Sequence, residues 1–317
     1  MLGGSLVGSE VLVTGGSGLM GLPIALALAP TCRVTAAARF SDDREIERLR
    51  AAAVEPVVFD LGDHDLSALP RRVDVVFHLG AMTGPAVERP ENKEVALEAN
   101  VRATGRLLSR YRHCRAFVYA SSGSTYAFQG DRPLREGDPY GLHNGLETYS
   151  ATKIAAEQVV HVLSQEWNVP AVILRIFSLY GPRGGALSGR LDQIAAGVPI
   201  EIYPDGPNRY CPMFESDYVE KAIAAVGLAS VPAEVVNFAG TEVSSVEEYC
   251  TVAGEMLGRR PTFEGTSRAP YPILPDTTKM ERLLGPTRVS VADGIRRVLA
   301  AGSGARTARW GRDPVAS

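Results

Sequence analysis

The stretch VLVTGGSGLMG, residues 11–21, runs from an apolar segment into a glycine-rich turn, and a helical pattern, LPIALALA, follows it. Gly15, Gly18 and Gly21 therefore fall at a predicted strand–turn–helix junction. Glycines there permit a tight turn and a close approach of the backbone to a pyrophosphate, which the helix N-terminus stabilises. The alternative is a turn needed only for packing. We predict a dinucleotide-binding turn, with the following cofactor contacts: Gly15, Ser17, Gly18, Leu19, Met20 and Gly21.

Further short apolar runs alternate with helical patterns along the chain. The predicted strands are RVTAAA (33–38), PVVFD (56–60), VDVVFHLGA (73–81), RAFVYASS (115–122) and AVILRIFSLYG (171–181). Continuous apolar strands with intervening helices indicate a parallel sheet covered on both faces. We therefore predict an α/β fold with a doubly wound, Rossmann-type sheet.

The pattern changes near residue 181, where glycine and proline become frequent. We predict a dinucleotide-binding domain over 1–180, a smaller substrate-binding lobe mainly over 181–300, and a disordered tail over 301–317. The segment EVVNFAG, 234–240, is expected to return to the sheet as a late strand.

Composition limits the classes of function. The chain has 317 residues, 45% hydrophobic and 22% charged, which is typical of a globular protein. A net charge of -3 gives no electrostatic footprint for nucleic acid or an anionic membrane. No apolar run is long enough to span a bilayer, and no signal peptide is expected. The four cysteines are far apart and are predicted to be reduced packing residues, so we expect a cytoplasmic protein without a metal site.

The residue after the second predicted strand bears on cofactor choice. NAD sites usually carry an acid there, about 20 residues past the glycines. This chain has Arg39, whose charge and bidentate geometry suit a 2′-phosphate, so NADP is predicted, with Ser41 beside it. In the alternative, Arg39 stacks on adenine, and Asp42 or Asp43 binds the ribose of NAD. At the end of the third strand, Asp60 and Leu61 are predicted to lie beside the adenine.

The segment YSATK, 149–153, places Tyr149 and Lys153 four residues apart in a predicted helix, and therefore on one face. One interpretation is a half-buried tyrosine next to a solvated lysine. The other is a phenol made acidic by its neighbour so that it can transfer a proton. Lowering a phenol pKa from about 10 to near neutrality takes roughly 4 kcal/mol. A cation 4 to 5 Å away supplies about 3 to 4 kcal/mol at an effective dielectric constant near 20.

Taken in order, these segments resemble the extended short-chain dehydrogenase/reductase family, in its NAD-dependent epimerase/dehydratase branch. The resemblance covers about residues 9–240 and rests on TGGSGLMG (14–21), VFHLGA (76–81), Asn100, ASSGSTY (120–126), YSATK (149–153) and RIFSLYGPR (175–183). It implies that Tyr149 is the catalytic acid/base. It also implies that Lys153 binds the nicotinamide ribose and lowers the tyrosine pKa, and that Ser122 hydrogen-bonds the reacting oxygen.

Other positions are assigned around these. His78, within an apolar strand, is interpreted as a core histidine and not as a base. The remaining predicted cofactor contacts are Gly80, Ala81, Asn100 and Phe177. For Asn100 the alternative is a polar residue that only packs a helix. The predicted substrate contacts are Thr83, Ser122, Ser124, Ser178, Arg183 and Arg209. A diphosphate could be bound by Arg183, Arg190 or Arg209, each of which could equally be a solvated charge.

The resemblance also bears on the reaction. Family members that eliminate water carry an acidic pair where this chain has Gly123 and Ser124, so we expect an epimerase or ketoreductase and no dehydratase. The predicted substrate is a nucleotide sugar, although Ser178 stands where such enzymes usually have Asn, and RYCPMF (209–214) replaces an Arg-Asp-aromatic run. The alternatives are a reductase of a non-sugar ketone and a non-catalytic dinucleotide sensor. A homodimer formed through the YSATK helix is also expected.

Overall fold

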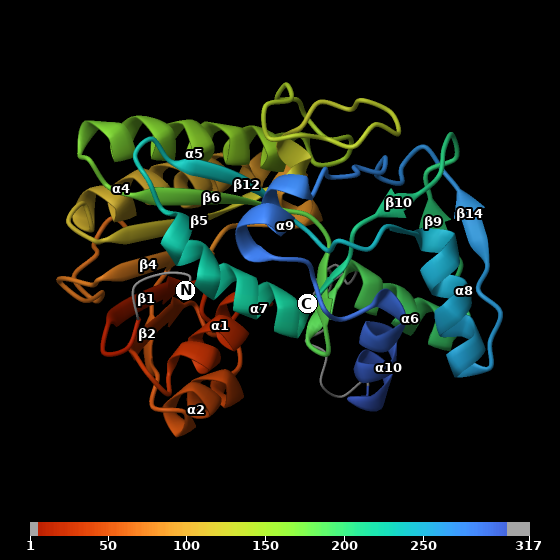
Figure 1. Ribbon diagram of the computed structural model, residues 1–317, viewed down its shortest axis with the longest axis horizontal. Helices are drawn as coiled ribbons and strands as arrows, with labels where there is room; N and C mark the ends of the chain where they lie inside the picture. Colours follow the sequence, from red (N-terminus) through yellow and green to blue (C-terminus); the bar gives the residue numbers. More distant parts are fainter. Residues whose placement is uncertain (1–5, 303–317) are drawn as a thin grey trace. The chain divides into compact units, whose positions relative to one another are not determined.

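The computed structural model describes residues 6–302 and divides into two compact units. The first unit comprises residues up to Ala127, Glu136–Ile176 and Val219–Phe238. It contains one sheet of seven strands in the order β12-β6-β5-β4-β1-β2-β3, with every neighbouring pair parallel (Figure 1). The strands are β1 (Glu10–Thr14), β2 (Arg33–Ala38), β3 (Glu55–Val58), β4 (Val75–His78), β5 (Ala116–Ser122), β6 (Ala171–Ile176) and β12 (Glu234–Phe238). The predicted doubly wound sheet is therefore confirmed.

The strand order reverses between β1 and β4, which are hydrogen-bonded neighbours. At such a switch point, loops leave the carboxyl ends of adjacent strands in opposite directions, and ligands of open α/β sheets bind there. The glycine turn follows β1, and the 79–84 segment follows β4. The topology therefore brings both segments to this point.

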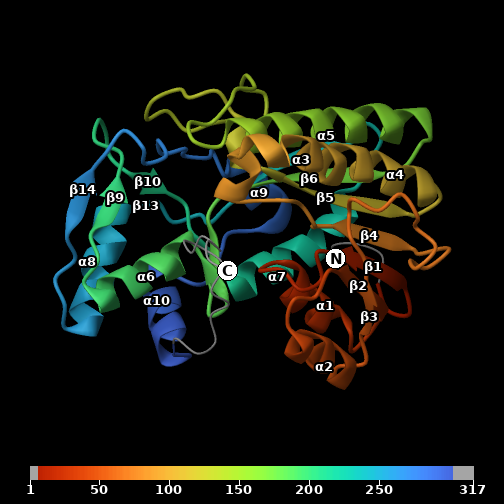
Figure 2. The same cartoon turned by 180° about the vertical axis from the view of Figure 1, so that it is seen from behind.

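Helices cover both faces of this sheet. Figures 1 and 2 show α1 (Gly21–Leu28) and α2 (Asp43–Ala51) on one face, and α3 (Lys93–Leu97), α4 (Ala103–Arg110) and α5 (Glu147–Glu166) on the other. Leu107 of α4 and Val160 of α5 are fully buried in one core cluster with Phe117 and Ile173 of the sheet. This double burial explains why the strands read as continuous apolar runs.

Helix α5 carries the YSATK segment, and its first turn is capped from elsewhere. Its own N-cap residue is Leu146, which offers no side-chain acceptor. Glu88, at the end of the 3-10 helix η1 (Pro85–Glu88), accepts hydrogen bonds from the backbone amides of Thr148 at 2.9 Å and Tyr149 at 3.0 Å. A carboxylate at a helix N-terminus satisfies orphan amides and complements the helix dipole. Glu88 therefore fixes the end of α5 that holds Tyr149.

The second unit comprises Phe128–Arg135, Phe177–Tyr218 and the residues from Ala239 onward. Its core gathers apolar side chains of α6 (Ala186–Ala196), α8 (Val246–Leu257) and α10 (Val291–Ala300). Its remaining elements are β7 (Leu179–Gly181), β8 (Gly184–Gly185), β9 (Ile200–Ile202), β10 (Arg209–Tyr210), β11 (Met213–Phe214), β13 (Ser244–Ser245), β14 (Phe263–Gly265) and α9 (Thr278–Leu284). The division between the units falls within α7 (Glu215–Ala224), which η5 (Ala225–Leu228) follows.

The chain thus passes between the units more often than a single boundary near residue 180 implies. The 128–135 segment joins the second unit, whereas 219–238 returns to the first. Strand β12 lies inside the predicted returning segment 234–240 and pairs with β6. The predicted tail lies, from residue 303 on, outside the described residues. Over residues 6–302, no helix is long and apolar enough to cross a membrane.

Candidate active site

The glycine turn is built so tightly that side chains would not fit at its ends. Gly15 has a φ of 70°, and a Cβ built there would lie 2.8 Å from Cα of Gly80. A Cβ on Gly21 would lie 2.1 Å from the carbonyl oxygen of Gly15. At Gly18, between them, the nearest atom would be that same oxygen, at 3.1 Å. Gly15 and Gly21 are thus required by packing, and Gly18 keeps the surface of the turn free of a side chain, which fits a pyrophosphate at the N-terminus of α1.

The end of β2 presents a cation. Arg39 is the first residue after the strand, its side chain is 75% exposed, and its Nε lies 3.9 Å from Oδ2 of Asp60. Asp42, the nearby acid, caps α2 by accepting from the backbone amide of Arg44 at 3.0 Å and pairs with the Arg44 guanidinium at 2.8 Å. This pairing holds the pKa of Asp42 below its usual range. Arg39 is therefore freer than Asp42 to meet a ligand at this strand end.

His78 is a core residue, as predicted. Its Nδ1 lies 2.8 Å from the hydroxyl of Thr14, and its Nε2 lies 2.9 Å from the hydroxyl of Thr104. Thr104 donates its own proton to the carbonyl of Asn100, which leaves its oxygen able to accept from Nε2. Burial, with repulsion from Lys153, lowers the pKa of His78 to about 3. Both nitrogens are occupied, which excludes a role as general base.

Asn100 holds the loop after β4 in place. It lies in the π-helix η3 (Glu98–Arg102), where Oδ1 accepts from the amide of Met82 at 2.7 Å and Nδ2 donates to the carbonyl of Met82 at 3.0 Å. Nδ2 also donates to the hydroxyl of Thr152 on α5. The side chain is buried with these contacts, which favours the packing alternative over direct cofactor binding. The fixed loop contains Gly80 and Ala81, and Gly80 donates its amide to Thr14.

The fold brings Ser122, Tyr149 and Lys153 together at the carboxyl end of β5. Ser122 is the last residue of that strand, and the interaction of its hydroxyl with Tyr149 lowers the pKa of the phenol. The Lys153 ammonium donates to the carbonyl of Ala120 at 2.8 Å and lies 5.9 Å from the centre of the Tyr149 ring. Lys153 is 3% exposed, so the alternative of a solvated lysine is wrong.

The electrostatics differ from the expectation that Lys153 lowers the pKa of Tyr149. Burial raises the pKa of Tyr149 to about 12, and the interaction with Ser122 opposes that rise. Burial also lowers the pKa of Lys153 to about 7, with Glu157 acting in the opposite direction. At neutral pH, Lys153 is therefore only partly charged, and its ammonium is directed to a carbonyl. The lowering of the Tyr149 pKa expected from the sequence included the attraction of the cation but not the desolvation of Tyr149 and Lys153, which opposes the charged form of both groups.

One acidic residue that was not identified from the sequence follows Lys153 on the same face of α5. Glu157 is fully buried and forms an ion pair of 2.8 Å with Arg175 of β6. Tyr140 donates to the same carboxylate at 2.8 Å. The spacing of Tyr149, Lys153 and Glu157 by four residues was a signal that could have identified this carboxylate.

The predicted substrate residues fall in both units. In the first, Ser124 is buried and its hydroxyl lies 2.9 Å from that of Ser122, whereas Thr83 is exposed in the segment after β4. In the second, Ser178 gives its carbonyl to the amide of Met213 at 2.8 Å, and Phe177 packs against Cys211, Ala239 and Leu274. All four cysteines are free and buried, as expected of packing residues.

The arginines of the second unit are not equivalent. Arg209 lies on β10, 3.7 Å from Asp131, and its buried Nε has no hydrogen-bond partner. Arg190 of α6 packs against the rings of Tyr210 and Tyr249 and donates to the Tyr249 hydroxyl at 2.5 Å. The interpretation of Arg190 as a solvated charge is therefore wrong. Arg183 acts electrostatically on Tyr218.

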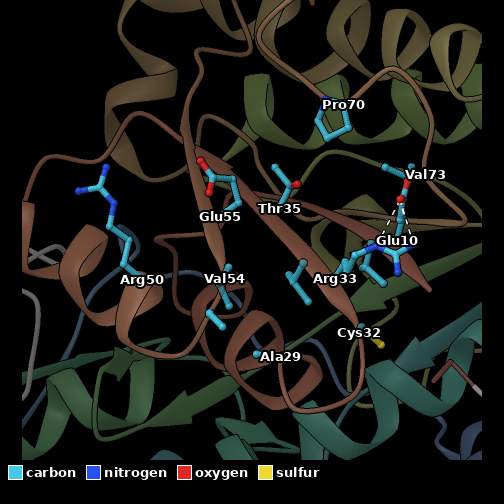
Figure 3. A pocket seen from close by; sticks show the side chains of 13 residues that line it. Glu10, Ala29, Cys32, Arg33, Thr35, Arg50, Val54, Glu55, Pro70 and Val73 are labelled. Carbon is cyan, nitrogen blue, oxygen red and sulfur yellow. Dashed lines mark hydrogen bonds and ion pairs between the residues drawn. The ribbon is translucent and has the colours of Figure 1, made fainter. Parts of the chain in front are cut away.

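Each unit contains a hollow that is lined by neither Tyr149 nor Lys153. One, of about 620 Å³, surrounds the amino ends of β1, β2 and β3. Figure 3 shows Glu10 and Arg33 paired there. The two atoms of this ion pair lie 3.0 Å apart. This hollow lies at the opposite ends of these strands from the glycine turn and presents no acid/base pair, so we do not assign the reaction to it. The other, of about 260 Å³, lies in the second unit and is lined by Phe128, Gly130, Asp131, Tyr203, Asp205, Gly206 and Pro272.

Comparison with known proteins identifies relatives. A family model described as "NAD dependent epimerase/dehydratase family" matches residues 11–239. The uncharacterized UDP-glucose epimerase YtcB of Bacillus subtilis (strain 168) is 30% identical over 245 residues, which are 74% of this chain and 76% of that protein. A UDP-glucuronic acid 4-epimerase from Bacillus cereus, solved with UDP-glucuronic acid and NAD, matches with a TM-score of 0.81 at 24% identity, covering 92% of this chain and 98% of its own. MoeE5, solved with UDP-glucose and NAD, matches with a TM-score of 0.77 at 26% identity, over 92% and 98%.

Proposed function

Because the chain belongs to the NAD-dependent epimerase/dehydratase family, we propose that it is a nucleotide-sugar epimerase in which Tyr149 transfers the proton of the reacting hydroxyl. The resemblance predicted from the sequence is thereby confirmed, and with it an enzyme of the short-chain dehydrogenase/reductase type. Relatives described as UDP-sugar epimerases support the substrate class, with UDP as the nucleotide.

The observation that carries the proposal is the convergence of Ser122, Tyr149 and Lys153 at the carboxyl end of β5. A general acid/base must reach the hydroxyl it deprotonates, and Ser122 offers a second hydrogen bond at the same point. Gly123 and Ser124, which follow Ser122, provide no second carboxyl group for an elimination. The site is therefore equipped for proton transfer at a carbinol and not for dehydration.

The residues around the switch point fit a nicotinamide dinucleotide. The turn 15–21 would hold the pyrophosphate, and Gly80 and Ala81 would leave room for the ribose near Lys153. The dinucleotide, when bound, accepts hydrogen with its electron pair from the substrate carbon and returns it. The chain's own part is to orient the sugar through Ser122 and to take up and return the hydroxyl proton through Tyr149.

Arg39 would select the phosphorylated dinucleotide, NADP. Its exposed guanidinium follows β2, and Asp42 is engaged as the cap of α2. The solved structures named above hold NAD, so the alternative, NAD bound without help from Arg39, is the competing outcome.

The second unit would hold the nucleotide. Phe128 stacks at 4.4 Å on Tyr271 and lines the 260 Å³ hollow, whose aromatic wall suits a planar base. Arg209, whose Nη2 lies near Asp131 of that wall, has a buried Nε without a hydrogen-bond partner, a donor suited to a phosphate. Exposed Val95, Leu97 and Val162 on α3 and α5 would support the expected homodimer.

The test is an epimerisation assay with UDP-glucose and UDP-glucuronic acid, combined with identification of the dinucleotide released on denaturation. We expect a 4-epimer product and a tightly held oxidised dinucleotide. Tyr149→Phe should retain the fold and bind dinucleotide but lose at least about a hundredfold in kcat. A fully active Tyr149→Phe variant would refute the role of the phenol, and turnover only with added reduced cofactor would identify a reductase.

A further inference from the structure

Three consecutive residues of β5 receive three side chains of one face of α5. The carbonyl of Ala120 accepts from Lys153, the hydroxyl of Ser121 donates to Glu157, and the hydroxyl of Ser122 lowers the pKa of Tyr149. Tyr149, Lys153 and Glu157 are spaced by one helical turn each. The Tyr149–Lys153 pair therefore belongs to a longer row of contacts between α5 and β5. Glu157 makes the contact that lies farthest from Tyr149 along the helix.

Glu157 is held more firmly than either residue of the pair. Arg175 donates from Nη2 to Oε2 at 2.8 Å and from Nε to Oε1 at 3.0 Å, and both side chains are almost completely buried. The Arg175 guanidinium lies between two aromatic rings, 4.7 Å from Tyr126 and 4.9 Å from Tyr140. A two-point, buried ion pair cannot shift without exposing an unpaired charge.

The hydrogen bonds that hold Arg175 continue to β12, the strand at the edge of the sheet. Arg175 donates from Nη1 to the carbonyl of Glu136 at 3.0 Å, and Glu136 accepts from the backbone amide of Asn237 on β12 at 2.9 Å. The hydroxyl of Tyr126 donates to the side chain of Asn237 at 2.6 Å. The carboxylate is thus joined to three neighbouring strands, β5, β6 and β12.

We propose that Glu157 is a positioning residue of the Tyr149–Lys153 pair: its fixed carboxylate aligns α5 with the end of β5 and favours the charged form of Lys153. The inference rests on the proposed function in that it assigns Glu157 to the site of the proposed reaction. Glu157 does not touch the reacting atoms, since Ser121, Arg175 and Tyr140 occupy its oxygens.

The charges around Lys153 support this role. Lys153 faces the hydroxyl of Tyr119 at 3.5 Å, the ring of Tyr149 and, through electrostatic repulsion, His78. Glu157 favours the charged form of Lys153, whereas burial favours the neutral form. The groups that face Glu157 from other elements are Ser121, Tyr119, Tyr140 and Arg175, and His161 faces it from α5. Removing the carboxylate should therefore shift Lys153 toward its neutral form.

The test measures Lys153 directly. The chain has four lysines, Lys93, Lys153, Lys221 and Lys279, so a spectrum of protein labelled with ¹³C at lysine Cε contains few signals, and Lys153→Met identifies the relevant one. We expect the Lys153 midpoint near pH 7 in the native chain and about one pH unit lower in Glu157→Gln. Glu166→Gln makes the same change at the exposed end of α5 and should leave the midpoint in place.

Activity provides the second measurement. Since the neutral lysine no longer supports the phenolate, the alkaline limb of the kcat profile of Glu157→Gln should move to lower pH by the same amount as the Lys153 midpoint. If Glu157 only stabilised the fold, the variant would lower Tm and leave both the midpoint and the profile unchanged, which would overturn the proposal.

The single variant leaves Arg175 without its anion and could fail to fold. Glu157→Gln combined with Arg175→Gln removes both buried charges and should give the same downward shift of the lysine midpoint. An unchanged midpoint in this folded double variant would also overturn the proposal. Because the titration requires no substrate, it decides the role of Glu157 even if the native chain epimerises no nucleotide sugar, an outcome that would refute the proposed function alone.

Discussion

The glycine turn and the inner face of α5 both meet the switch point of the sheet, but they are built in opposite ways. The turn works by the absence of side chains: a Cβ on Gly15 or Gly21 would lie within 2.8 Å or 2.1 Å of backbone atoms. The face of α5 works by the presence of polar side chains, the half-buried Tyr149 and the buried Lys153 and Glu157, whose charges depend on the β5 and β6 strands behind them.

The two regions differ in how far along the chain the interactions that define them extend. The steric requirements of the turn involve atoms a few residues apart or on the next strand. The spacing of the glycines is therefore enough to predict where side chains are not tolerated. The pKa of a buried group depends on everything that has replaced water around it. The spacing in YSATK therefore places Tyr149 and Lys153 on one face of a helix but does not give the pKa of the phenol. Substitutions in the two regions should therefore have effects of different kinds.

The largest expected effect on stability is that of Gly21→Ala. Its Cβ would lie 2.1 Å from a backbone oxygen, so the turn must open, and we expect the free energy of unfolding to fall by about 3 kcal/mol. Gly18→Ala is the matched control, because its Cβ contact of 3.1 Å requires only a small shift, and it should cost less than about 1 kcal/mol. Urea unfolding measures both. Equal losses would mean that the turn is not organised by these contacts.

In Gly18→Ala the loss should appear in ligand binding. A methyl group on the face of the turn should weaken dinucleotide affinity about tenfold, or roughly 1.4 kcal/mol. Titration calorimetry with the dinucleotide measures this. Unchanged affinity would place the pyrophosphate elsewhere.

Lys153→Met should separate stability from activity. The pKa of Lys153 falls from 10.5 when unfolded to about 7 when folded, so between these values the unfolded chain binds more protons. Native stability should therefore rise with pH across that window. At pH 7, the free energy of unfolding of Lys153→Met should be higher than that of the native chain, with the difference shrinking toward pH 10.5, and the variant should be inactive. Urea unfolding at pH 7 and pH 10 measures this, and a destabilised variant would show that the lysine is not strained by burial.

The smallest expected effect is that of Arg39→Ala. Because the guanidinium is exposed and follows β2, its removal should leave stability unchanged and weaken NADP binding about tenfold, with NAD unaffected. Fluorescence titration with both dinucleotides measures the ratio. If the native chain already binds NAD more tightly than NADP, the NADP assignment is wrong.

Much of the fold could be predicted from the sequence because apolar runs, and the glycines in the turns between them, are local features. The strands ending at Ala38 and Ser122 were predicted, as was the return of β12. The strand predicted over 73–81 ends earlier, at His78, and the one predicted over 171–181 is divided into β6 and β7. The second unit was described only as loop-rich, because β10, β11 and β13 are two-residue strands whose partners lie far away in the chain.

The candidate site divides in the same way. The sequence by itself determined the position of the glycine turn, the place of Ser122 at a strand end, the shared helix face of Tyr149 and Lys153, and the core role of His78, because residue type and spacing fix which atoms can share a face or a strand end. Only the tertiary structure decided that Asn100 is bonded to the Met82 backbone, that Glu157 and Arg175 form a buried pair, and that Tyr149 and Lys153 are shifted in pKa by burial. The physical reason is that desolvation belongs to the assembled surroundings of a group, and no short segment contains them.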